Sequence, residues 1–127
     1  DGSRVVTASW DRIANIWDSR TGTLIKTLRG HRGAVVACEF SPNDTRVVTA
    51  SADNSARVWI SANGSLIIIL QHLCSVWSCA FSPDGRRIVT AGFNSIALLW
   101  DAETGKCQLS LQREHNNILT CCCFSHD

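Results

Sequence analysis

The chain has 127 residues and a formal net charge of +1, from 12 basic and 11 acidic side chains. This balance gives no general attraction to nucleic acid or to an anionic membrane surface. The longest apolar run, LIIIL at residues 66–70, is far too short to cross a bilayer, and the sequence does not begin with a signal-peptide pattern. We therefore expect neither nucleic acid nor a membrane among the partners.

Short strand candidates, separated by turns, follow one another along the chain. In the best-defined unit they are rich in β-branched and apolar residues, which favour strands, and they read AVVACEFS (34–41), RVVTAS (46–51), SARVWIS (55–61) and SLIIIL (65–70). The Asn, Asp and Gly residues between them favour turns. No segment has sustained apolar spacing at three and four residues, so no helix is expected. Each unit is predicted to be a four-stranded antiparallel sheet.

The same pattern returns every 41 to 43 residues. VVTAS at residues 5–9 recurs at 47–51 and, as IVTAG, at 88–92. The phenylalanine-serine pair at 40–41 recurs at 81–82 and 124–125. Two single residues keep a similar spacing, a tryptophan at Trp17, Trp59 and Trp100 and a histidine at His31, His72 and His115. Such self-similarity is the signature of a repeat architecture.

These markers, with a Ser-x-Asp turn and a closing Trp-Asp pair, resemble WD40 repeats over essentially the whole chain. The resemblance implies a β-propeller in which each unit forms one blade. We expect residues 1–127 to be a partial propeller, with a blade lacking its first strand at 1–28, whole blades at 29–71 and 72–113, and the first strand of another at 114–127. Because few propellers have fewer than about four blades, the remainder of a longer propeller is expected to close the ring. The alternative is a three-repeat unit that closes by self-association.

The resemblance also implies a buried hydrogen-bond network in each blade. Its members in the second unit are His31, Ser51, Asp53 and Trp59, and in the first unit Ser9, Asp11 and Trp17. Imidazole, hydroxyl, carboxylate and indole groups supply complementary donors and acceptors. In the third unit Gly92 and Asn94 replace the serine and the aspartate, so that network is predicted not to form as in the family and that blade to be the softest.

Partners of the family commonly bind the propeller face whose loops carry the histidine and the turn aspartate. The partner-binding residues predicted on this face are Trp10, Trp77, Phe93 and Arg32, because aromatic side chains and Arg dominate interface energetics. The alternative is that Trp10 and Phe93 pack against neighbouring loops and that Trp77 belongs to the core.

A second motif, Trp17, Asp18 and Arg20, is similar to the WDxR box of WD40 substrate receptors that dock on the adaptor of cullin-RING ubiquitin ligases. In that interpretation Arg20 donates to the adaptor while Asp18 holds the arginine in place. The alternative is that Arg20 is a solvated turn residue.

The seven cysteines are predicted to be unpaired. Cys38, Cys79 and Cys122 share the strand face of the repeat phenylalanine, so we expect small core residues, whereas Cys121 and Cys123 point to the opposite face. The spacing offers no paired set of metal ligands, and we expect no metal or other cofactor. Abundant free thiols favour a reducing compartment, the cytoplasm or the nucleus.

The main hypothesis is a non-catalytic scaffold that binds other proteins or peptides. An enzyme would need acidic or histidine side chains at the starts of the inner strands, where the chain has Ala34, Val35, Ser75, Val76, Ile118 and Leu119. Nucleic-acid binding would need a basic face, and Arg29 and Arg32 are too few for tight phosphate contact. The adaptor-docking substrate receptor stays the alternative.

Overall fold

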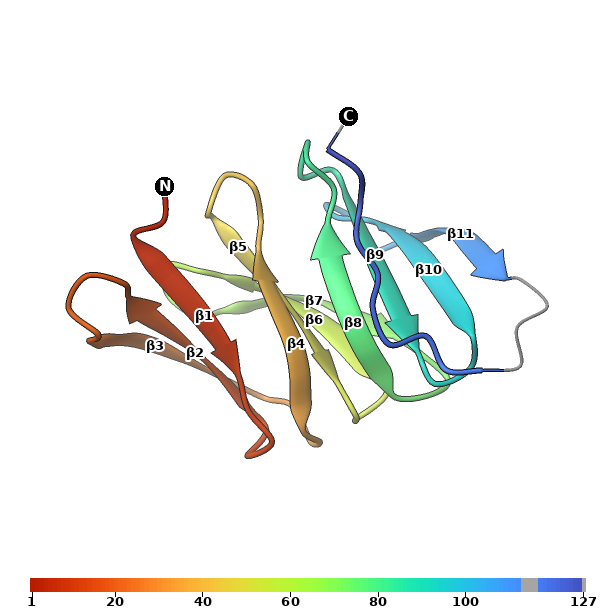
Figure 1. Cartoon of the computed structure of the whole chain (residues 1–127), viewed down its shortest axis with the longest axis horizontal. Coiled ribbons are helices and arrows are strands. Elements are labelled where there is room, and N and C mark those ends of the chain that lie inside the picture. The colour runs from red at the N-terminus through yellow and green to blue at the C-terminus, as the bar shows by residue number, and fades with distance from the viewer. Residues whose placement is uncertain (113–116, 127) are drawn as a thin grey trace.

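The computed structural model describes residues 1–112 and 117–126. These residues form eleven strands in three antiparallel sheets, and none of them is helical (Figure 1). The first sheet contains β1 (Arg4–Ala8), β2 (Ile13–Asp18) and β3 (Leu24–Arg29). The second contains β4 (Val35–Phe40), β5 (Arg46–Ser51), β6 (Ser55–Ile60) and β7 (Leu66–Gln71). The third contains β8 (Val76–Phe81), β9 (Arg87–Gly92), β10 (Ile96–Asp101) and β11 (Cys107–Gln112).

The predicted all-β fold with blade-like antiparallel sheets is confirmed. Within each sheet the strands pair in chain order, so each strand reverses direction through a short connection to the next. None of the described residues forms a helix that could cross a membrane.

The three sheets stack face to face, and side chains of the second sheet fill both spaces between them. One core contains Val47 and Trp59 with Ala14, Ile16 and Leu28 of the first sheet. The other contains Val48 and Val58 with Val76, Phe81 and Ile88 of the third sheet. Since successive residues of a strand face opposite sides, β5 and β6 supply alternate residues to the two cores. The middle strands are apolar on both faces for this reason.

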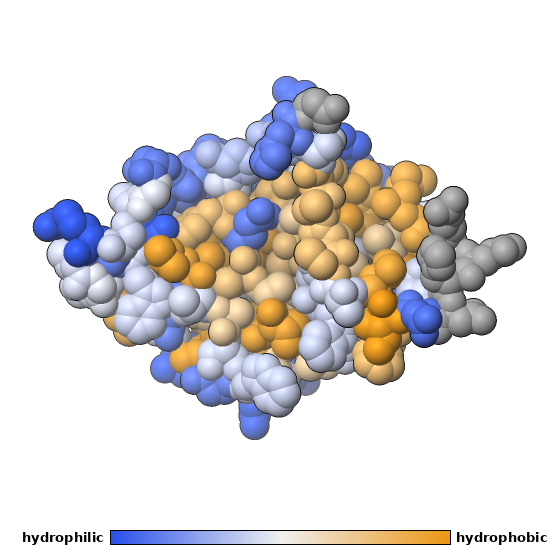
Figure 2. Space-filling view, viewed as in Figure 1, coloured by the Kyte–Doolittle hydropathy of each residue, from blue (hydrophilic) through white to orange (hydrophobic). Residues whose placement is uncertain are grey.

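The first strand of each sheet, β1, β4 or β8, lies toward the viewer in Figure 1. Figure 2 shows apolar side chains gathered over the middle of this view, between hydrophilic turns at both ends of the strands. Cys79 is buried in the core with Phe81, as predicted, while Cys38 and Cys122 are half-buried. Burial raises the pKa of the Cys38 thiol to about 11, so this side chain stays a neutral thiol.

The arginines that begin β1 and β5 link neighbouring sheets. Arg4 donates from Nη2 to the Asp44 carbonyl (2.8 Å) and from Nη1 to Ser61 Oγ (3.2 Å). Arg46 donates from Nη1 to the Ala102 carbonyl (2.8 Å) and from Nη2 to Glu103 (2.7 Å). Each guanidinium therefore joins the start of the second strand of a repeat to a turn of the next sheet.

Residues 117–126 form no strand with the other described residues, yet they run beside the third sheet (Figure 1). The Cys122 N–H donates to Ser78 Oγ (3.0 Å), and the Leu119 N–H donates to the Gly92 carbonyl (3.3 Å). The predicted blade limits stay a prediction. Residues 113–116, which include His115, and residue 127 lie outside the described residues.

Candidate interaction face

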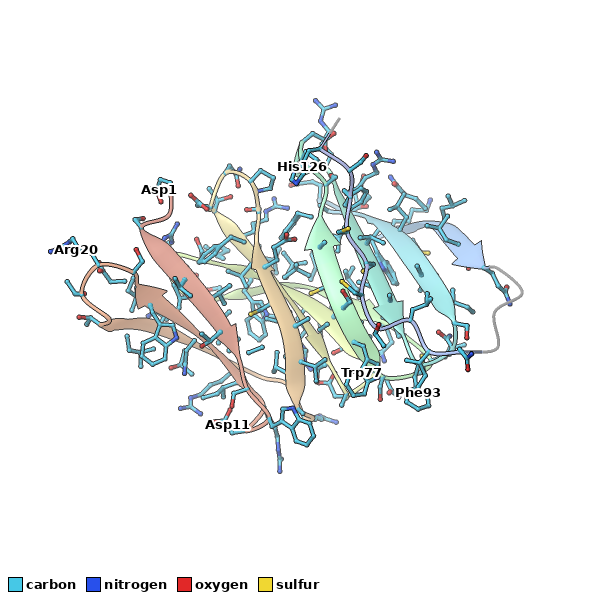
Figure 3. The ribbon with its side chains drawn as sticks, viewed as in Figure 1. Asp1, Asp11, Arg20, Trp77, Phe93 and His126 are labelled. Carbon is cyan, nitrogen blue, oxygen red and sulfur yellow. The ribbon has the colours of Figure 1, made fainter. Side chains whose placement is uncertain are left out.

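One end of the three sheets is formed by a set of equivalent turns. In each turn one residue other than glycine has a left-handed backbone, at Arg12 (φ 74°), Asn54 (φ 66°) and Ser95 (φ 61°). This conformation reverses the chain sharply. Figure 3 shows that Asp11, Trp77 and Phe93 lie toward one edge of the molecule and Asp1 and His126 toward the opposite edge. We call the end formed by these turns the turn face.

A buried hydrogen-bond network stands behind the turn face in the second sheet. His31 Nδ1 donates to Asp53 Oδ2 (2.8 Å), while His31 Nε2 bonds the hydroxyl of Thr49 (2.7 Å). Trp59 Nε1 donates to the same hydroxyl (2.9 Å). The network therefore runs from the turn carboxylate through the imidazole and the hydroxyl to the indole.

The hydroxyl at the centre of the network is Thr49, which corrects the expectation that Ser51 would fill this place. Ser51 instead fixes the turn: its hydroxyl donates to the Gly33 carbonyl (3.1 Å) and accepts from the Asp53 N–H (3.1 Å). Trp59 lies opposite Val47 in the ladder, and its long ring reaches diagonally along the partner strand to position 49.

The third sheet has the same central hydrogen bonds, so the prediction that its network does not form as in the family is wrong for the hydroxyl. Trp100 Nε1 donates to Thr90 Oγ1 (2.7 Å), which also bonds His72 Nε2 (3.1 Å). Gly92 does not interrupt this chain, because the hydroxyl comes from two residues earlier. What the third sheet lacks is the carboxylate, since Asn94 stands in its place.

The first sheet follows the same rule. Trp17 Nε1 donates to Thr7 Oγ1 (2.8 Å), and Ser9, which was expected in this role, accepts from the Asp11 N–H (3.4 Å) in the turn. Thr7, Thr49 and Thr90 are the hydroxyls that sequence reasoning missed. Their equal spacing in all three units was the signal that could have found them.

Burial and hydrogen bonds fix the protonation states of Asp53 and His31 in the network of the second sheet. Burial raises the pKa of Asp53, but hydrogen bonds from Ser55, the Arg32 N–H and His31 outweigh burial and lower this pKa to about 2. Burial lowers the pKa of His31, against the opposing effect of Asp53. At neutral pH the carboxylate is therefore charged and the imidazole is neutral. With Thr49 fully buried, the set presents no accessible nucleophile and acts as a structural element.

Large side chains gather on the turn face itself. Trp10 is 81% exposed, Trp77 is 37% exposed, and Phe93 is also exposed. The Arg32 N–H is held by Asp53 Oδ2 (2.9 Å), so the backbone beneath this exposed residue is fixed. Leu73, which sequence reasoning missed, is 96% exposed. Its signal was its place directly after His72, since Arg32 directly follows His31.

The residues of the WDxR-like motif lie near the end of β2. Asp18 Oδ1 accepts from the backbone N–H groups of Arg20 (2.9 Å) and Thr21 (2.7 Å), and these bonds lower the Asp18 pKa. Asp101 caps the equivalent turn of the third sheet in the same way. Asp18 therefore holds the backbone of Arg20, and the Arg20 side chain points away from the sheets (Figure 3).

Within residues 1–112 and 117–126, no three His, Cys, Asp or Glu side chains gather closely enough to hold a metal ion.

A family model described as "WD domain, G-beta repeat" matches residues 1–18, 22–59 and 64–101. Each match ends at or next to a repeat tryptophan, Trp17, Trp59 or Trp100. The matches are offset from the sheets by one strand, because the second begins with β3 of the first sheet and the third begins with β7 of the second sheet.

The chain is also similar to curated proteins that carry the same repeat. It is 42% identical over 40 residues to the dynein assembly factor with WD repeat domains 1 of Xenopus laevis, covering 32% of this chain and 10% of that protein. It is 49% identical over 37 residues to the WD repeat-containing protein 37 of Mus musculus, covering 29% and 8%. It is 43% identical over 47 residues to the human WD repeat and SOCS box-containing protein 1, covering 35% and 11%. Each match spans about a tenth of the relative.

Proposed function

Because the chain belongs to the WD40 repeat family, whose members are generally protein-interaction scaffolds, we propose that it is a non-catalytic binding module for other proteins or peptides. The observation that carries this proposal is the exposure of Trp10, Trp77, Phe93 and Leu73 on one face. Large apolar side chains in water stabilise a complex when a partner covers them. The nearby Arg32 adds a cationic side chain to the same surface.

The arrangement of polar groups supports the non-catalytic part of the proposal. The histidine, hydroxyl and carboxylate of the second sheet all bond within a buried network that ends at Trp59. The described starts of the inner strands bear small or apolar residues, such as Ala34 and Val76. Neither place offers a group positioned for acid, base or nucleophilic chemistry.

The test is partner capture by the full-length protein. Trp10→Ala and Trp77→Ala are expected to reduce the proteins captured from a cell lysate while the melting temperature stays nearly unchanged. Hot-spot truncations cost roughly 2 kcal/mol or more of binding energy, which is about a thirtyfold loss of affinity. Ile25→Ala, on the rim of the first sheet, is the matched control and is expected to retain every captured protein.

Two results would contradict the proposal. If both tryptophan variants retain all partners, the turn face is not the partner surface. If Trp77→Ala melts early, Trp77 belongs to the core, because truncating a buried Trp costs about 3–5 kcal/mol of fold stability.

The second candidate function is docking on a ubiquitin-ligase adaptor through Trp17, Asp18 and Arg20. It is supported by the outward direction of the Arg20 side chain on a backbone that Asp18 fixes. Arg20→Ala is expected to remove a captured adaptor selectively and to spare the partners that depend on Trp10. If no adaptor is captured by the unchanged protein, this candidate fails while the scaffold proposal stands.

We also propose that further blades close the ring around this unit and that the protein works in the cytoplasm or the nucleus. Residues 117–126 lie against the third sheet, which supports a continuing stack of blades. The seven free thiols support a reducing compartment. Localisation of a fluorescently tagged full-length protein tests the second statement, and a secreted product would contradict it.

A further inference from the structure

The outer strand β7 leaves one edge of the second sheet open. β6 is its only neighbour in that sheet, with Val58 opposite Ile68 and Arg57 opposite Ile69. In a stack of blades, an outermost strand keeps its outer edge free however many blades are added. The unpaired N–H and C=O groups of such an edge are ready to bond another strand.

This edge has no charged side chain or Pro to protect it against pairing, although the pairing of β6 with β7 shifts between Val58 and Trp59. Natural sheets guard an open edge with charged residues, especially Lys, or with Pro. β3, the outer strand of the first sheet, carries Lys26 and Arg29. β7 carries neither, and no Asp, Glu, Lys or Arg occurs anywhere between Arg57 and Asp84.

Three apolar side chains of β7, Leu66, Ile67 and Ile69, are exposed, whereas Leu70 is fully buried. Ile67 is 41% exposed and Ile69 is 48% exposed, and their spacing of two residues places them on the same face of the strand. The sequence LIIIL at 66–70 reads the same in both directions about Ile68. A strand of this kind is complementary to a second copy of itself in the antiparallel direction.

We propose that β7 pairs antiparallel with β7 of a second copy of this chain, with the two-fold axis at Ile68. The two second sheets then form one continuous sheet across the dimer. In this register Ile67 lies directly opposite Ile69 of the second copy, so four exposed isoleucines cover one another. Directly opposed residues have Cβ atoms about 4.5–5.5 Å apart, within van der Waals reach of isoleucine side chains.

A second copy fits this edge better than the strand of an unrelated protein for two reasons. A two-fold pairing uses the same patch on both partners and closes, which gives a dimer and no open filament. With no charged side chain on the strand, the pairing also brings no like charges together. This surface is separate from the turn face, so a dimer leaves Trp10 and Phe93 free for the proposed partner.

The first test measures self-association of the full-length protein by sedimentation at increasing concentration. The unchanged protein is expected to move from monomer to dimer. Ile69→Lys is expected to raise the dissociation constant at least about tenfold, because a lysine on the edge cannot be covered by the second copy. Ile25→Lys, on the guarded strand β3 where Ile25 is 43% exposed, is the matched control and is expected to change nothing.

Three results would overturn the proposal. They are a monomer at every concentration, an Ile69→Lys variant that dimerises as well as the unchanged protein, and an Ile25→Lys variant that is weakened equally. Trp10→Ala is expected to leave the dissociation constant unchanged, so failure of the proposed partner surface is distinguishable from failure of the dimer.

The second test fixes the register and does not depend on the lysine variant folding. An equal mixture of Ile67→Cys and Ile69→Cys chains is oxidised mildly, and the linked peptides are identified by mass spectrometry. A disulfide between positions 67 and 69 is expected in the mixture, with little 67–67 or 69–69 linkage, because diagonal neighbours lie about 7–8 Å apart, beyond ordinary disulfide reach. Equal linkage in all combinations, or none, would contradict the antiparallel pairing about Ile68.

Discussion

The threonine at the centre of the buried network provides the sharpest test of the structure. Thr49→Val keeps the shape of the side chain but removes the hydroxyl that accepts from Trp59 Nε1 and bonds His31 Nε2. Both rings are buried, so neither nitrogen can turn to water for a replacement. A buried polar group left without a partner costs about 1–3 kcal/mol, and two such groups give an expected loss of about 2–6 kcal/mol.

Ser51→Ala is the matched comparison, because Ser51 is equally buried and was the residue first expected in the network. Its hydroxyl bonds only the Gly33 carbonyl and the Asp53 N–H, so we expect a loss of about 1 kcal/mol. Urea unfolding of the full-length protein measures both variants. With a slope of about 1–3 kcal/mol per molar urea, the two midpoints are expected to differ by about 1 M.

A matching variant in the third sheet checks the same reasoning. Thr90→Val removes the partner of Trp100 Nε1 and His72 Nε2 and is expected to cost about as much as Thr49→Val. The assignment of the hydroxyl fails if Ser51→Ala destabilises the protein as much as Thr49→Val, or if Thr90→Val has no effect.

Three further predictions concern the turn, the protonation state and the close approach of two chain segments. Asp53→Ala is expected to lower the urea midpoint more than Asn94→Ala, because the Asp53 carboxylate accepts from His31, the Arg32 N–H and Ser55; equal losses would contradict this ranking. Burial lowers the pKa of His72 to about 4, so between its ordinary pKa of about 6.5 and that value the unfolded chain binds the extra proton. Stability is therefore expected to fall by up to about 3 kcal/mol as pH drops through this window, and a melting temperature that is flat from pH 7 to pH 4.5 would contradict it. Gly92→Ala is expected to lower the melting temperature, because a Cβ at this position would meet the Ser75 carbonyl at 2.5 Å, and an unchanged melting temperature would show that β8 and β9 can separate there.

Much of the fold follows from the sequence, because alternation and turn residues are local signals. The short apolar runs predicted at 46–51 and 55–61 are β5 and β6 to within a residue. The choice between Thr49 and Ser51 is different, since two residues apart on a strand they share one face. Which hydroxyl meets the imidazole depends on the register, and the pairing of β4 with β5 shifts between Val35 and Ala37. Local sequence does not encode this shift.

The repeated positions of the tryptophan and the threonine in the three units identify the network hydroxyl from the sequence. In every unit the repeat tryptophan lies opposite a residue two positions before the threonine, as Trp17 lies opposite Val5 and Trp100 opposite Ile88. The reach of the indole is therefore constant, and the threonine is present in all three units. The serine, by contrast, is absent from the third unit, where Gly92 occupies its position. The exposure of a loop side chain such as Leu73 depends on the three-dimensional conformation of the loop, so it could not be predicted from the sequence.

The buried network and the turn face meet at one carboxylate. Asp53 Oδ2 accepts from both His31 Nδ1 (2.8 Å) and the Arg32 N–H (2.9 Å), so the group that satisfies the buried imidazole also fixes the loop that displays Arg32. In the third sheet, among the described residues, Asn94 makes no such side-chain bond to the loop that displays Leu73. A partner that contacts Arg32 meets a backbone that Asp53 already holds, whereas the backbone at Leu73 lacks a carboxylate contact of this kind. The second sheet is therefore expected to contribute more binding free energy per contact than the third, although its exposed apolar surface is smaller.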